Sequence, residues 1–175
     1  MDYHVVIDLE MCKVPKSCRT KSYKWQNETI QIGAVLLNRD YEVVDSFNTF
    51  VSPEYGYVDP FIKSLTGIQP KDVANAPKMT EAIKMFTDWI PQGEVEIVSW
   101  SDSDANQLRR EMTGKEICND RMEELFETWN DCQVTFSEKM KADRRYNLRE
   151  ALIAAKVTSI GIFSYYFRFI LYEAS

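Results

Sequence analysis

The order of apolar segments along the chain restricts its fold more than any other feature. Four runs rich in β-branched residues have the length of buried strands. They are Tyr3 to Leu9, Thr29 to Leu37, Tyr41 to Val51 and Val95 to Trp100. Strand hairpins followed by helices, with one further strand between helices, predict an α/β fold with a mixed sheet flanked by helices.

The helix-like segments have apolar residues that repeat at helical spacing. They are Pro60 to Leu65, Pro77 to Ile90, Asp104 to Met112, Arg121 to Trp129, Gln133 to Met140 and Leu148 to Ala155. Asn147 and Glu150 form a capping-box pattern at the start of the last one. The chain has 175 residues without repeats or a linker, which predicts one domain.

The composition excludes several classes of function. Twenty-one basic and 27 acidic residues give a net charge of −6, which does not suit a broad grip on duplex DNA. The single histidine, His4, excludes a serine–histidine triad elsewhere and a zinc site with several histidines. The four cysteines show no C-x-x-C pair and the chain has no evident secretory signal, so we expect reduced thiols and a cytoplasmic protein. Ile160 to Tyr172 is too short to cross a bilayer, so we expect no membrane partner.

The charges are unevenly distributed. Lys13 to Trp25 contains five basic residues and no acid, and Lys139 to Arg149 contains five basic residues and one acid. Glu111 to Glu127 holds six acids against Lys115 and Arg121. These clusters are either ordinary solvated faces or, for the two basic ones, small patches that face phosphates.

Asp8 and Glu10 stand at the end of the first expected strand. Their spacing of two places both carboxylates on one face of that strand. Two neighbouring carboxylates repel each other unless a cation lies between them, and oxygen ligands suit Mg²⁺ or Mn²⁺ better than Zn²⁺. The alternative is a strand that simply emerges into solvent at Asp8.

Asp102 and Asp104 follow the strand that ends near Trp100, at the beginning of a helix. Either one could merely cap that helix. If both strands end at the same edge of the sheet, one of these two carboxylates could converge with Asp8 and Glu10. Several carboxylates around two divalent ions are the arrangement of two-metal phosphodiester cleavage.

The sequence resembles the DnaQ-like (DEDDh) 3′–5′ exonucleases, which have a ribonuclease H-like fold, and within them the Eri-type and KapD-type branch. The resemblance is carried by Val6 to Glu10, Glu28 to Val35, Phe50 to Pro53, Leu65 to Ile68, Ala76 to Pro77, Ser99 to Asp104 and Tyr146 to Leu152. It implies hydrolysis at the 3′ end of RNA or single-stranded DNA with two Mg²⁺ or Mn²⁺ ions. Asp8, Glu10 and Asp104 would be the catalytic metal ligands, and the match favours Asp104 over Asp102.

The same resemblance implies a set of substrate contacts. Leu9 and Met11 would meet the 3′-terminal nucleotide, and Leu65 and Thr66 would contact its sugar and base. For Leu65, an ordinary core leucine is the alternative. Trp100 would either stack on a base or pack beneath the site.

The third motif of the family, His-x4-Asp or Tyr-x3-Asp, has no counterpart here. From Ala151 to Ser175 the chain contains no His and no Asp, and Glu173 is its only acid in that stretch. We therefore expect an exonuclease domain over residues 1–155, a divergent or out-of-frame tail over 156–175, and impaired catalysis. The alternative is a catalytically inactive member of the fold that binds nucleic acid or protein.

Overall fold

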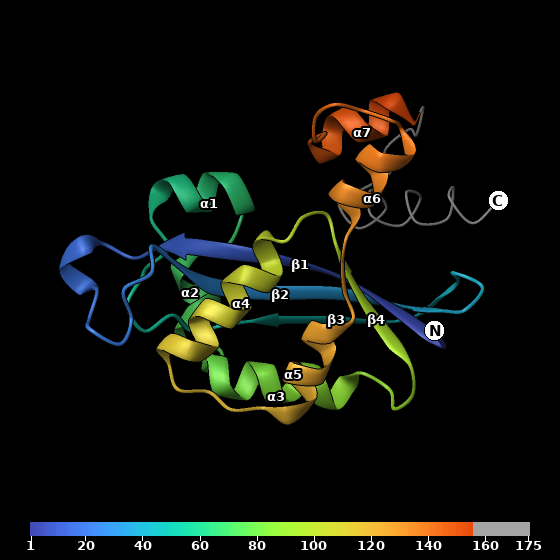
Figure 1. Ribbon diagram of the computed structural model, residues 1–175. Helices are drawn as coiled ribbons and strands as arrows, with labels where there is room; N and C mark the ends of the chain where they lie inside the picture. Colours follow the sequence, from blue (N-terminus) through green and yellow to red (C-terminus); the bar gives the residue numbers. More distant parts are fainter. Residues whose placement is uncertain (156–175) are drawn as a thin grey trace.

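A five-stranded mixed sheet forms the centre of the domain (Figure 1). The computed structural model describes residues 1–155. The strands are β1 (Tyr3–Lys13), β2 (Asn27–Asn38), β3 (Val43–Phe50), β4 (Val95–Ser99) and β5 (Trp129–Asp131). Their order across the sheet is β3-β2-β1-β4-β5. β2 pairs antiparallel with both β1 and β3, and β4 pairs parallel with both β1 and β5. The expected mixed sheet is confirmed, and β1 is its central strand.

Helices cover both sides of the sheet. They are α1 (Pro60–Thr66), α2 (Pro70–Ala74), α3 (Met79–Trp89), α4 (Ser103–Gly114), α5 (Asp120–Glu127), α6 (Cys132–Lys139) and α7 (Leu148–Ala154), with a 3₁₀ turn, η1 (Lys16–Cys18). In Figure 1, α3 and α5 lie below the sheet, whereas α1, α6 and α7 lie above it. The segment between β1 and β2, which includes η1, projects beyond the end of β1.

The side chains on the two faces of β1 have different surroundings. Val5, Ile7 and Leu9 are buried in the main core, together with apolar side chains of α3, α4 and α5. Val6 belongs to a separate buried cluster. Because side chains alternate along a strand, the even-numbered residues after Val6 lie on the face opposite the main core.

The expected strands and helices are found, with some differences at short elements and element ends. α2 was not expected, since it has only five residues. The expected helix from Arg121 to Trp129 is wrong at its end: α5 stops at Glu127, and the next segment is β5. Parallel pairing of Ile97 and Ser99 in β4 with Trp129 and Asp131 overrides the local helical pattern there.

Local sequence signals explain where α1 and α7, two of the helices above the sheet in Figure 1, begin or end. α1 begins at Pro60 after the cap Asp59, whose side chain accepts a hydrogen bond from the Ile62 N–H, and it ends at Gly67 in the left-handed conformation (φ 78°). Asn147 and Glu150 form the expected capping box of α7. The predicted tail, 156–175, and its apolar stretch lie outside the described residues. Within residues 1–155, no helix is long and apolar enough to cross a membrane.

Candidate active site

Asp8 and Glu10 lie on the side of β1 that faces away from the main core. Two residues along a strand correspond to about 7 Å. The neighbour of Asp8 on β2 is Gly33, which has no side chain, and the neighbour of Glu10 is Gln31. Both carboxylates are half-buried, and the buried Leu9 lies between them. The strand therefore holds two acidic groups in a partly desolvated position rather than ending in solvent.

Asp104, in the first turn of α4, reaches the edge of β1. The parallel pairing of β4 with β1 ends at Val6 and Val98, so β1 continues with an open edge at this point. The Asp104 carboxylate accepts a hydrogen bond from the backbone N–H of Leu9, which lies between Asp8 and Glu10. The structure thus brings Asp104, from the second acidic segment, to the strand that carries the first.

The electrostatics show that the three carboxylates share one environment. Burial, together with the charge of Asp8, raises the pKa of Asp104 to about 7, and the charge of Glu10 contributes in the same direction. Burial and the charge of Asp8 also raise the pKa of Glu10. Carboxylates that are desolvated and repel one another in this way are stabilised by a divalent cation.

These residues fit a hydrated, oxygen-preferring cation better than a closed metal cage. Within residues 1–155, no group of three or more His, Cys, Asp or Glu side chains is arranged to hold a metal ion by itself. Mg²⁺ usually keeps several waters and takes only one or two carboxylates directly. The donor chemistry of Asp8, Glu10 and Asp104 therefore suits Mg²⁺ or Mn²⁺ bound partly through water.

Asp102 has a different position. It is exposed and precedes α4 as its cap residue, but its side chain accepts no hydrogen bond from the first turn of the helix. Asp104, by contrast, is only 6% exposed and contacts β1. This difference favours Asp104 as the site residue.

The four apolar residues expected to contact substrate have unequal exposure. Leu65 is 69% exposed on α1, so the alternative of a core leucine is wrong. The Leu9 side chain is buried in the main core, and the Met11 side chain packs against that core. Of Leu9, only the backbone is therefore left to lie near the carboxylates of Asp8 and Glu10. Trp100 is 8% exposed and packs beside Phe136, which favours packing beneath the site over base stacking.

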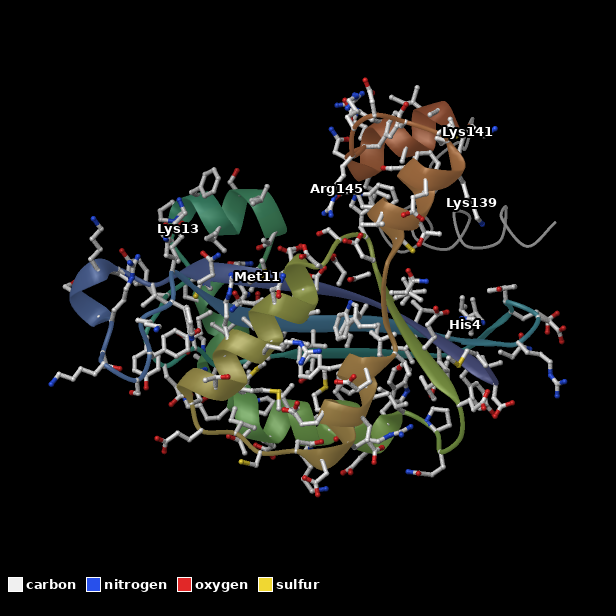
Figure 2. The ribbon with its side chains drawn as sticks, viewed as in Figure 1. His4, Met11, Lys13, Lys139, Lys141 and Arg145 are labelled. Atoms are coloured by element: carbon white, nitrogen blue, oxygen red, sulfur yellow. The ribbon has the colours of Figure 1, made fainter. Side chains whose placement is uncertain are left out.

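Thr66 and His4 have structural partners. The Thr66 hydroxyl donates to the Ile62 carbonyl and accepts from the Ile68 N–H, so it fixes the end of α1. His4 lies at the opposite end of β1 from Met11 and Lys13 (Figure 2). Its Nδ1 is 2.8 Å from Glu96 Oε2, and its ring stacks on Tyr41. His4 is thus not positioned to replace the histidine of the third motif.

A buried ionic network next to the site was missed at the level of sequence. Lys115 Nζ is 2.8 Å from Glu28 Oε1 and 2.8 Å from Glu111 Oε1, and both glutamates are fully buried. Glu28 also accepts hydrogen bonds from the N–H groups of Glu54, Tyr55 and Gly56 in the segment that leads to α1. The acidic cluster from Glu111 onward is therefore not a uniformly solvated face. The spacing of Glu111 and Lys115, one helical turn, was the available signal.

The two basic clusters also differ from each other. In the second cluster, Arg144 is paired with Glu150, and Arg145 lies 3.7 Å from Asp131. In the first cluster, no carboxylate of the described chain lies within ion-pair distance of Lys13, Lys16 or Lys24. Among the residues that the structure describes, the first cluster therefore keeps three unpaired lysines near the end of β1, whereas two arginines of the second cluster are paired.

A mixed sheet of this order, flanked by helices, is the ribonuclease H-like fold. The profile of the exonuclease family RNase_T matches residues 5–161 of this chain. The chain therefore belongs to this family of DnaQ-like, DEDDh 3′-exonucleases, which are hydrolases.

Solved structures show the same fold at low sequence identity. The nuclease domain of 3′hExo, a DEDDh family member bound to rAMP, matches with a TM-score of 0.79 and 20% identity over 99% of this chain and 90% of that chain. A 3′-exonuclease described as recognising the 3′ end of histone mRNA stem-loop matches with a TM-score of 0.78 and 18% identity over 97% of this chain and 80% of that chain. Cell-death related nuclease 4 matches with a TM-score of 0.73 and 17% identity over 93% of this chain and 57% of that chain.

A curated relative matches only locally. The PolC-type DNA polymerase III of Caldanaerobacter subterraneus subsp. tengcongensis is 38% identical over 63 residues, which are 36% of this chain and 4% of that protein. This chain thus spans a small part of the polymerase.

Proposed function

We propose that this chain is a 3′–5′ exonuclease of the Eri-type and KapD-type branch that acts on RNA or single-stranded DNA, and that its catalysis is impaired. The observation that carries the proposal is the mutual electrostatic influence of Asp8, Glu10 and Asp104, where β1 runs past the end of β4, in a chain that belongs to an exonuclease family. RNA is favoured by two structural relatives, one described as bound to rAMP and the other as recognising the 3′ end of histone mRNA stem-loop. Four free cysteines accord with the proposed cytoplasmic location.

The proposed roles follow from position. Asp8, Glu10 and Asp104 would hold the Mg²⁺ or Mn²⁺ ions, which when bound activate water and stabilise the leaving oxygen in this type of chemistry. The Leu9 N–H holds the Asp104 carboxylate in place against β1. The exposed Leu65 on α1 would contact the terminal base, and Thr66 would stabilise the end of α1 that presents it.

Shortening of a 5′-labelled single-stranded oligonucleotide tests the proposal directly. With Mn²⁺ or Mg²⁺, the wild-type protein should produce a ladder of products that lose nucleotides from the 3′ end. Asp8→Asn and Asp104→Asn should abolish the ladder, and Asp102→Asn should leave it unchanged. A wild-type protein that shortens no oligonucleotide even at high concentration would contradict the activity.

The proposed impairment rests on the residues after Ala151, which include neither His nor Asp. A general base contributes about a hundredfold to ten-thousandfold in rate, so its loss leaves slow hydrolysis. Imidazole added in solution should then accelerate the wild-type protein by supplying a base. A rate that does not respond to imidazole, at a level typical of intact exonucleases, would contradict the impairment.

The second candidate is an inactive member of the fold that binds nucleic acid or protein. The same missing third motif favours it. It predicts oligonucleotide binding that weakens with salt, without any shortening in the presence of Mn²⁺.

A further inference from the structure

Two adjoining hollows lie where the chain leaves β1. The first, of about 340 Å³, is lined by residues that include Lys13, Lys16 and Tyr57. The second, of about 450 Å³, is lined by residues that include Lys24, Trp25 and Arg110. Arg19, Gln26 and Asn27 line both, so the two hollows adjoin, and together they are called the groove below.

The groove is strongly positive on a protein of net charge −6. Five cations line it, and Asp59 is the one acid among the lining residues of the two hollows. Lys13, Lys16, Lys24 and Arg110 are exposed, and none has a carboxylate within ion-pair distance in the part of the chain that the structure describes. Uncompensated cations gathered in a hollow concentrate positive potential and attract polyanions.

An aromatic ring lies among these cations. Lys24 Nζ is 5.0 Å and the Arg110 guanidinium carbon is 5.9 Å from the ring centre of Trp25, which is half-buried. At the other end of the groove, Lys13 Nζ is 5.6 Å from the ring centre of Phe61, which is exposed on α1. Cations interleaved with aromatic rings are typical of surfaces that bind single-stranded nucleic acid.

The loop that carries the cations is anchored rather than loose. The Arg19 guanidinium donates to the Val14 carbonyl, and the hydroxyl of the buried Tyr23 donates to the Asn27 carbonyl. A Cβ atom at Gly114 would lie 2.7 Å from Tyr23 Cδ2 and 3.2 Å from Trp25 Nε1, so the loop packs closely on the end of α4. A groove fixed in this way loses little conformational entropy when a ligand binds.

The groove begins on the same strand as the candidate active site. Lys13 is the last residue of β1, three positions and about 10 Å beyond Glu10. Figure 2 shows Lys13 beside α1, farther along β1 than Met11. A strand whose 3′ end lies at Asp8 and Glu10 could therefore pass α1 and enter the groove.

We propose that this groove binds the phosphodiester backbone of single-stranded nucleic acid upstream of the 3′ end. The proposal rests on the proposed exonuclease function for the direction of the strand. A narrow groove with a handful of cations suits a single strand, whereas a duplex requires the broad basic surface that this acidic protein lacks.

The test compares a groove variant, Lys16→Gln/Lys24→Gln/Arg110→Gln, with a control of equal charge change outside both basic clusters, Arg39→Gln/Lys71→Gln/Lys84→Gln. Binding of a fluorescent single-stranded dodecanucleotide is measured by anisotropy with a metal chelator present, so that no hydrolysis occurs. We expect the groove variant to bind about tenfold more weakly or worse. Between about 50 and 200 mM salt, its affinity should fall about 20-fold less than that of the wild type, because each lost phosphate contact removes about 0.7 from the salt slope.

Several outcomes would contradict the proposal that the groove binds single-stranded nucleic acid. They are equal binding by wild type and groove variant, an equal loss in the control, and equally tight binding of a blunt duplex or of polyglutamate of matched charge. This binding assay does not depend on hydrolysis, because the chelator removes the metal. A failure of the proposed groove binding can therefore be distinguished from a failure of the exonuclease activity, which is measured by shortening in Mn²⁺.

Discussion

We predict that Lys115→Met strongly lowers the free energy of unfolding of this domain, because Lys115 is at the centre of a buried ionic network. The Lys115 side chain is 5% exposed and lies 2.8 Å from both Glu28 and Glu111, which are fully buried. Burial alone would lower the pKa of Lys115, but the charges of Glu111 and Glu28 more than offset this and raise it. Because its pKa is raised, Lys115 stays protonated at neutral and mildly alkaline pH, where its charge balances the two buried carboxylates.

The magnitude follows from what the substitution leaves behind. Methionine keeps most of the apolar stem but removes the charge, so two buried carboxylates lose their cation. Glu28 keeps three backbone N–H donors and Glu111 keeps the Thr29 N–H and the Gln107 amide, which soften the loss. Breaking a buried pair from one side costs about 3–5 kcal/mol, which corresponds to a fall in Tm of about 6–20 °C for a domain of this size.

Thermal and urea unfolding followed by circular dichroism measure the effect. The control is Lys84→Met, since Lys84 is exposed and pairs with Asp88 one turn along α3. It should cost no more than about 0.5 kcal/mol. Adding Glu111→Gln to Lys115→Met should restore part of the stability by removing one stranded charge. A Lys115→Met protein that unfolds within about 1 kcal/mol of the wild type would refute this reasoning.

Three further predictions concern individual residues. Burial and the charge of Asp8 raise the pKa of Asp104 to about 7, so the folded state holds this proton more tightly than the unfolded state. The metal-free protein should therefore lose stability as pH rises from about 4 to 7, and Asp104→Asn should reduce that loss in thermal melts. Gly114→Ala should destabilise the fold by about 1–3 kcal/mol in urea unfolding, because its Cβ would collide with the buried Tyr23, and an unchanged midpoint would contradict the tight packing. Burial raises the pKa of the Cys12 thiol to about 12, so iodoacetamide at pH 8 should modify the exposed Cys18 but leave Cys12 unmodified until the protein unfolds, as read by mass spectrometry.

Local patterns in the sequence were sufficient to predict most of the sheet and two of its carboxylates. The spacing of Asp8 and Glu10 fixes their common face, since alternation along a strand is a local property. The capping box at Asn147 and the stop at Gly67 are local in the same sense. These features were predictable because they depend on neighbours in the sequence.

The features that depend on distant partners were not predictable. The burial of Glu28 depends on Lys115 and on the loop before α1, which are far away in the sequence. β5 exists because β4 supplies its hydrogen-bond partners, and Leu65 is exposed because of the way α1 lies on the sheet. Charge counts alone likewise did not show that Arg144 is neutralised by Glu150, whereas Lys24 is not neutralised.

Titration calorimetry with Mn²⁺ tests the central claim that Asp8 and Asp104 belong to one divalent cation site. The wild-type protein should bind Mn²⁺, and Asp8→Asn, Asp104→Asn and the double variant should all lose binding to a similar extent, because the two carboxylates act as a unit. Asp102→Asn should bind like the wild type. Unchanged binding in Asp104→Asn together with a loss in Asp102→Asn would contradict the account.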